Sequence, residues 1–139
     1  MQLSWCFLGF KHARRARMRV LVIEDDQSVR ETLGMVLEAY GHKADLVENG
    51  EQALGYLQYR WPDVMLLDLT MPGMSGEEVF ESISSRFGRV PPTVVVSAAY
   101  GGELRARRMR GSWFLAKPYT LEELCDLINE AGAQERTVA

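Results

Sequence analysis

The stretch VMLLDLTMPGMSG, residues 64–76, decides the fold, because four apolar residues run directly into Asp68 and a loop rich in proline and glycine follows. The run 64–67 has the length and composition of a buried strand. In α/β proteins with parallel strands, ligands gather at the carboxyl ends of the strands. A carboxylate in this position therefore predicts a functional site at one edge of a sheet.

Three further apolar runs end in polar or charged residues in the same way. They are residues 20–23 before the acidic triplet 24–26, residues 93–96 before Ser97, and residues 113–116 before Lys117. Because the carboxyl ends of parallel strands meet at one edge, we expect these carboxylates, the hydroxyl and the ammonium group to converge there. This set of groups suggests a divalent metal, a phosphoryl group and an acceptor aspartate.

From residue 19 onward, short apolar runs alternate with segments of helical periodicity. The predicted strands are 20–23, 43–47, 64–67, 93–96 and 113–116, and the predicted helices are 27–40, 50–58, 75–87, 103–110 and 120–131. Strict alternation of this kind predicts an α/β fold with a parallel sheet, right-handed crossovers and helices on both faces.

The composition is that of one globular domain, with 139 residues, 47% apolar and 25% charged. Cys6 and Cys125 form no CxxC pair, so neither a disulfide framework nor a zinc site is indicated. Two reduced thiols are typical of a cytoplasmic protein. No apolar run reaches the roughly 18–20 residues that a membrane span requires.

The charge is divided unevenly along the chain. Residues 1–19 contain five basic residues and no acidic one, whereas the remainder has 11 basic and 19 acidic residues. We predict a basic N-terminal extension over 1–18, either disordered or preceding the native start, a domain over 19–131, and a frayed tail over 132–139. A targeting arm and the end of a preceding segment are the alternatives for the extension.

The acidic residues at the predicted edge suit a hard cation. Clustered carboxylates repel one another and are costly unless a cation neutralises them. Glu24, Asp25 and Asp68 offer oxygen ligands, which Mg²⁺ prefers, and Mn²⁺ is an alternative ion. The competing interpretation of the triplet is a solvated loop in which Asp26 caps the next helix.

The remaining groups suit phosphoryl transfer. An aspartate that attacks a phosphoryl donor becomes an aspartyl phosphate. Such transfer depends on positioning and charge neutralisation. Lys117 would pair with one phosphoryl oxygen and Ser97 would donate a hydrogen bond, whereas the alternatives are a surface lysine and a turn serine.

Four segments, taken in order, resemble the receiver domain of bacterial two-component response regulators. They are VIEDD at 22–26, LDLTMPGMSG at 67–76, VVSA at 95–98 and LAKPY at 115–119. The resemblance extends over about 19–131. It implies a flavodoxin-like, doubly wound (βα)5 fold whose five-stranded parallel sheet has the order 2-1-3-4-5.

The resemblance also implies a role for each site residue. The magnesium ligands would be Asp25 and Asp68 directly, the backbone carbonyl of Thr70, and Glu24 through water. Asp68 would be the phosphoacceptor, and Ser97 and Lys117 would contact the phosphoryl group. The Lys117–Pro118 peptide bond is expected to be cis.

The implied output is a change of surface. Phosphorylation would draw Ser97 inward, Phe114 would follow, and the face made by 103–110, 113–116 and 120–131 would change shape. Such a switch is a shift between two populated states. Phe114 lacks the hydroxyl of the tyrosine that is commoner in the family, and the stretch between Ser97 and Lys117 is about two residues shorter than usual.

The partners implied are a sensor histidine kinase or a histidine phosphotransfer protein on the input side. On the output side they are a downstream protein or a covalently linked effector, with a homodimer as an alternative. Neither direct nucleic-acid binding nor membrane binding is expected.

Weak autophosphorylation and autodephosphorylation would make the term enzyme a matter of definition. Four arginines in 105–110 form either a solvated helix face or a docking surface for an acidic partner.

Two other functional classes compete with this one. A degenerate receiver would act as a phosphate-independent interaction module, but Asp68, Ser97 and Lys117 are all present. Aspartate-nucleophile phosphatases carry an acid/base aspartate two residues after the nucleophile, where this chain has Thr70. Binding of a metal and of a phosphate analogue would discriminate between the classes.

Overall fold

The computed structural model describes residues 17–98 and 100–138, and strands and helices alternate strictly along them. The strands are β1 Arg19–Ile23, β2 Lys43–Val47, β3 Val64–Asp68, β4 Thr93–Ser97 and β5 Trp113–Ala116. The helices are α2 Gln27–Ala39, α3 Gly50–Leu57, α4 Gly76–Phe87, α5 Gly102–Arg107 and α6 Leu121–Val138. All strand pairs are parallel in the order β2-β1-β3-β4-β5, which confirms the predicted fold.

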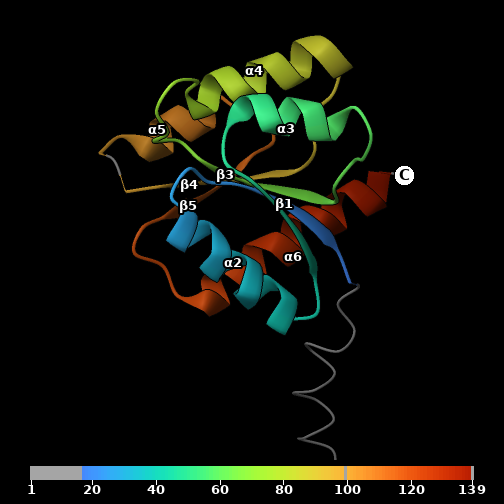
Figure 1. Ribbon diagram of the computed structural model, residues 1–139, viewed down its shortest axis with the longest axis vertical. Coiled ribbons are helices and arrows are strands. Elements are labelled where there is room, and N and C mark those ends of the chain that lie inside the picture. The colour runs from blue at the N-terminus through green and yellow to red at the C-terminus, as the bar shows by residue number, and fades with distance from the viewer. Residues whose placement is uncertain (1–16, 99, 139) are drawn as a thin grey trace, which may run out of the picture.

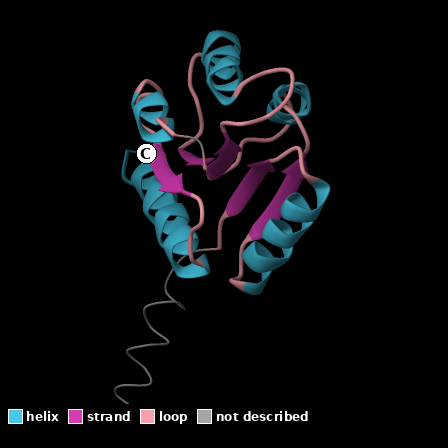
Figure 2. Ribbon diagram, turned by 90° about the vertical axis from the view of Figure 1, so that its left-hand side faces the viewer, coloured by secondary structure: helices cyan, strands magenta, loops and turns pink. Residues whose placement is uncertain are grey.

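Helices cover both faces of the sheet. Figure 1 shows α2 and α6 on one face and α3, α4 and α5 on the other, and Figure 2 shows the same layers after a quarter turn. Alternate strand residues supply the two cores: Val20 and Val22 pack with the α2–α6 layer, whereas Leu21 and Ile23 pack with the α3–α4 layer. Burial on both faces explains why the central strands are continuous apolar runs.

The chain departs from the predicted boundaries at both ends. Residues 1–16 lie outside the described part, but Met18 is only 4% exposed and its carbonyl accepts from the Lys43 amide at 2.8 Å. The last helix, α6, continues through the predicted tail to Val138. A Cβ at Gly132 would lie 1.9 Å from the Met18 sulfur. Gly132 therefore makes room for Met18 within the helix and does not end it.

Side-chain caps fix where α2 and α4 begin, and so where two of the loops at the site end. Asp26 accepts from the Val29 amide at 3.0 Å and opens α2. A reciprocal capping box between Ser75 and Glu78 opens α4, as the sequence predicts. None of the helices in the described ranges is both long and apolar enough to cross a bilayer.

Gly76 is a position where a side chain would disturb both the core and the site. A Cβ there would lie 2.7 Å from Leu69 Cδ2, 3.0 Å from the Leu69 Cα and 3.3 Å from the Asp68 carbonyl oxygen. We expect Gly76→Ala to lower the free energy of unfolding by about 1–3 kcal/mol, because backbone must move. Urea unfolding would measure the change.

The matched control is Gly55→Ala in α3, where a Cβ would meet nothing within 4 Å. That substitution should raise the free energy of unfolding by roughly 0.5–1 kcal/mol through helix propensity. Equal effects of the two substitutions would contradict the role of close packing at Gly76.

Candidate functional site

The site lies at the carboxyl edge of the sheet. Asp68 and Ser97 are the last residues of β3 and β4, and Glu24 and Lys117 come directly after β1 and β5. Backbone hydrogen bonds extend the pairing beyond the strands, from the Lys117 amide to the Ser97 carbonyl at 3.0 Å and from the Glu24 amide to the Val47 carbonyl at 3.1 Å. The site residues are therefore held by the sheet itself.

Three carboxylates form a cluster that could hold a metal ion. Glu24, Asp25 and Asp68 each offer an oxygen, and these oxygens lie within 4.8 Å of one another. Glu24 is 4% exposed and Asp68 is 7% exposed, whereas Asp25 is exposed to solvent. Two buried carboxylates with one open side suit Mg²⁺, which binds one or two carboxylates and keeps several waters.

The electrostatics of Glu24 also fit a cation. Burial, together with the nearby charge of Asp68, raises the pKa of Glu24 to about 7, although the Asp26 amide opposes the shift by donating a hydrogen bond at 3.2 Å. A carboxyl group that is reluctant to ionise beside other carboxylates needs positive charge. The donor set is therefore consistent with a divalent ion.

Asp68 has a distinct partner for each oxygen. Its Oδ1 accepts from the Thr70 amide at 2.8 Å, and its Oδ2 lies 3.1 Å from Lys117 Nζ. Lys117 Nζ is also 3.9 Å from Glu24 Oε1. Burial lowers the pKa of Lys117, but the hydrogen bond and charge of Asp68 outweigh burial and raise it. The carbonyl of Thr70 as a metal ligand stays a prediction.

Ser97 and Phe114 lie under the beginning of α5. Ser97 is 2% exposed, and half-buried Phe114 packs against a small cluster that includes Ala106 of α5. A Cβ at Gly102 would lie 3.0 Å from Ser97 Oγ and 3.3 Å from Phe114 Cε1. A displacement of either side chain would therefore reach α5 directly. The Lys117–Pro118 bond beside them is cis, as expected.

The raised pKa of Glu24 predicts how stability varies with pH in metal-free protein. Because the carboxyl binds a proton more tightly in the folded state, between pH 4.5 and about 7 the folded state holds more protons than the unfolded state. The contribution of Glu24 to the free energy of unfolding should therefore fall as pH rises through this window, by up to ~3 kcal/mol.

Urea unfolding in EDTA at several pH values would measure the change, with Glu24→Gln as the control that removes the ionisable group. If the Gln variant showed the same pH dependence as the wild type, Glu24 would not be its source.

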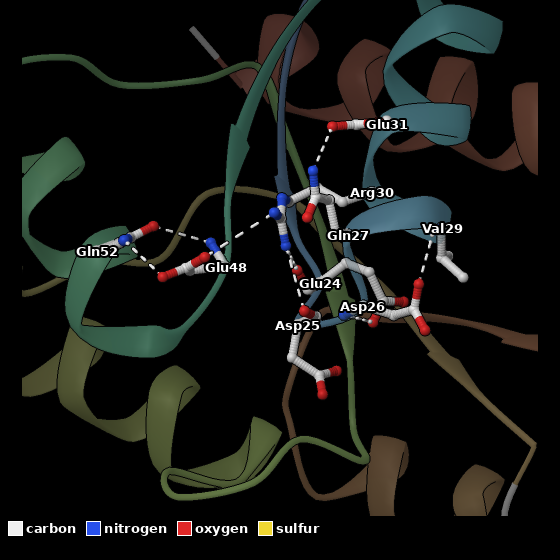
Figure 3. Close-up of polar contacts among 9 residues, drawn as sticks. All are labelled: Glu24, Asp25, Asp26, Gln27, Val29, Arg30, Glu31, Glu48 and Gln52. Carbon is white, nitrogen blue, oxygen red and sulfur yellow. Dashed lines mark hydrogen bonds and ion pairs between the residues drawn. The ribbon is translucent and has the colours of Figure 1, made fainter.

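Two arginines at this edge were not singled out by the sequence as site residues. Arg30 in α2 donates to the backbone carbonyls of Glu24 and Asp25 (Figure 3). Arg105 in α5 makes two 2.6 Å hydrogen bonds to Glu77 in the first turn of α4. The sequence could have indicated Arg30, because it lies in the first turn of a predicted helix. A cation there is unfavourable with the helix dipole and therefore needs a specific partner. Arg105 is engaged within the fold and is not a free member of the arginine row.

Comparisons with known proteins agree with this arrangement. The family model described as "Response regulator receiver domain" matches residues 20–129. Response regulator MprA from Mycobacterium avium is 35% identical over 108 residues, which cover 77% of this chain and 47% of the relative. The Sensory/regulatory protein RpfC from Xanthomonas campestris is 34% identical over 135 residues, which cover 93% of this chain and 19% of the relative.

Among solved structures, a sensor protein from Polaromonas superposes with a TM-score of 0.76 at 30% identity, covering 86% of this chain and 98% of that one. The chain spans less than half the length of the curated relatives named above. Those relatives therefore contain further regions that this sequence does not match.

Proposed function

The chain belongs to the family of response regulator receiver domains, and from that premise we propose that it is a phosphoacceptor switch in which Asp68 takes a phosphoryl group from a phosphohistidine donor. The observation that supports the proposal best is the environment of Asp68. One of its oxygens is paired with Lys117, and the carboxylate lies in a cluster with Glu24 and Asp25. The groups that we propose as nucleophile, countercharge and metal ligands are thus within one small volume.

The proposed chemistry is an in-line displacement. An Asp68 carboxylate oxygen forms a bond to phosphorus while the bond from phosphorus to the donor's imidazole nitrogen breaks. Lys117 would turn from the carboxylate to the transferred group and neutralise one of its oxygens, and Ser97 would donate its hydroxyl hydrogen to another. Mg²⁺ held by Asp25, Asp68 and the Thr70 carbonyl, and by Glu24 through water, would neutralise the remaining charge.

The proposed output is a shift between two conformations. Movement of Ser97 toward the phosphoryl group would release space for Phe114, and α5 would follow because both side chains lie where a Cβ at Gly102 would meet them. The face of α5, β5 and α6 would then bind a downstream protein, a linked effector or a second copy of the chain. We propose a cytoplasmic setting, with a histidine kinase or phosphotransfer protein as donor and no direct contact with nucleic acid or membrane.

The test is the intact mass of the chain after incubation with acetyl phosphate. A gain of one phosphoryl group that requires Mg²⁺ and disappears with EDTA would support the proposal. If no adduct forms, beryllofluoride, a stable phosphoryl mimic, separates the remaining explanations. Mg²⁺-dependent binding of beryllofluoride would indicate a short-lived phosphate, and absence of binding would favour a phosphate-independent interaction module.

A further inference from the structure

Arg30 donates hydrogen bonds to the backbone of Glu24 and Asp25, two of the three residues of the carboxylate cluster. Its Nη1 donates to the Glu24 carbonyl at 2.9 Å and to the Asp25 carbonyl at 3.2 Å. The Arg30 side chain is only 15% exposed. Figure 3 shows the guanidinium on one side of this loop and the Asp25 carboxylate pointing away on the other. Arg30 thus touches the backbone of the loop from the side opposite the Asp25 carboxylate.

The loop needs such a support because of where it lies. Glu24 and Asp25 come between the last residue of β1 and the cap of α2, so their carbonyls are outside both the sheet ladder and the helix. The contact at the Glu24 carbonyl is partly buried, and a backbone carbonyl that is withdrawn from water requires a donor. One guanidinium group supplies a donor to two successive carbonyls, which restricts rotation about the peptide unit between them.

A second contact ties this loop to its neighbour. Arg30 Nη2 lies 3.9 Å from Glu48 Oε2 in the loop after β2, and Glu48 is in turn hydrogen bonded to Gln52 of α3. The Glu48 side chain is 53% exposed, so this ion pair contributes little by itself. The two carbonyl bonds therefore carry the interaction, and Glu48 orients the far side of the guanidinium.

We propose that Arg30 is a positioning residue for the metal site: its Nη1, donating to both carbonyls, holds the backbone of Glu24 and Asp25 so that their carboxylates face Asp68. This inference rests on the proposed function, because it presumes that the carboxylates bind a metal. Groups that orient metal ligands through hydrogen bonds typically change metal affinity 10–100-fold when they are removed.

A competing role for Arg30 is that of a countercharge to the carboxylates. The two roles differ in what lysine can replace. Lysine keeps the positive charge, but its ammonium group ends a flexible stem and lacks the rigid guanidinium plane that places Nη1 between the two carbonyls while Nη2 faces Glu48. Positioning therefore predicts that Arg30→Lys loses about as much Mg²⁺ affinity as Arg30→Gln, whereas a countercharge predicts that the lysine variant binds Mg²⁺ like the wild type.

The experiment is calorimetric titration of the full chain with Mg²⁺ alone, for the wild type, Arg30→Lys, Arg30→Gln and the control Arg60→Gln. Arg60 is exposed and lies after α3, so its substitution makes the same charge change away from the loop. We expect the dissociation constant to rise about 10-fold in both Arg30 variants and less than about 2-fold in the control. Urea unfolding in EDTA gives the fraction of each variant that is folded, so that affinity is compared among folded molecules only.

Three results would overturn the proposal, and they have different meanings. If Arg30→Lys bound Mg²⁺ like the wild type while Arg30→Gln did not, Arg30 would act through its charge. If both variants kept wild-type affinity, the hydrogen bonds from Arg30 to the Glu24 and Asp25 carbonyls would have no role in metal binding, and the proposed function would stand. If the wild type bound no Mg²⁺, the metal site itself would be refuted, and the role of Arg30 with it.

Discussion

In Asp68→Asn we expect no covalent phosphoryl adduct under conditions in which the wild type is fully modified. The amide has no anionic oxygen to attack phosphorus, so the expected effect is complete loss. The fold should remain, because asparagine has nearly the same shape and can still accept from the Thr70 amide, which now donates to Asp68 Oδ1 at 2.8 Å. Intact mass after treatment with acetyl phosphate and Mg²⁺ measures the outcome.

The same variant should also respond differently to the removal of metal. Replacing the Asp68 charge removes one source of the raised Glu24 pKa, so in EDTA stability should fall less steeply with pH than in the wild type. The control is Asp26→Asn, since asparagine caps a helix as well as aspartate does and Asp26 lies outside the carboxylate cluster. An adduct that persists in Asp68→Asn would show that another residue is the acceptor.

The sequence was most informative where local pattern and topology coincide. The runs 20–23, 64–67 and 93–96 are buried on both faces of the sheet, so their apolar character is continuous and easy to recognise, and the run 113–116 at the sheet edge is apolar although only Leu115 is fully buried. Polar residues at their carboxyl ends must then meet at one edge. This reasoning placed Asp68 and Lys117 at the same edge, and in the structure they are hydrogen bonded at 3.1 Å although they are 49 positions apart in the chain.

The sequence was least informative where a residue acts through a distant contact. Gly132 is typical of a helix end, but its partner is Met18, 114 residues earlier, and α6 continues past it. The pairing of Arg105 with Glu77 is equally hidden, because an arginine row on a short helix is also typical of a solvated face. The predicted helix end was wrong because tertiary packing overrides local propensity, whereas the Arg105–Glu77 pair is a tertiary contact that the sequence does not indicate.

Lys117→Met should have the second large effect, and the size of its effect on stability depends on whether metal is present. Lys117 is the cation that pairs with Asp68, at 3.1 Å, while Glu24 and Asp25 add negative charge to the same cluster. In EDTA we expect the free energy of unfolding to fall by about 2 kcal/mol, which is less than for a fully buried pair because the Lys117 side chain is 31% exposed. In saturating Mg²⁺ the deficit should shrink, since the ion then neutralises Asp68.

Metal binding and phosphoryl transfer should therefore change in opposite directions in this variant. Without a competing ammonium group, the cluster should bind Mg²⁺ more tightly than in the wild type. Transfer should nevertheless slow by about 100-fold, the usual cost of losing one preorganised group that stabilises transferred charge. Calorimetry and the rate of adduct formation test the two halves separately, with Lys43→Met, an exposed lysine at the start of β2, as the control. If affinity and rate fell together, Lys117 would act by holding the shape of the site and not by meeting the phosphoryl group.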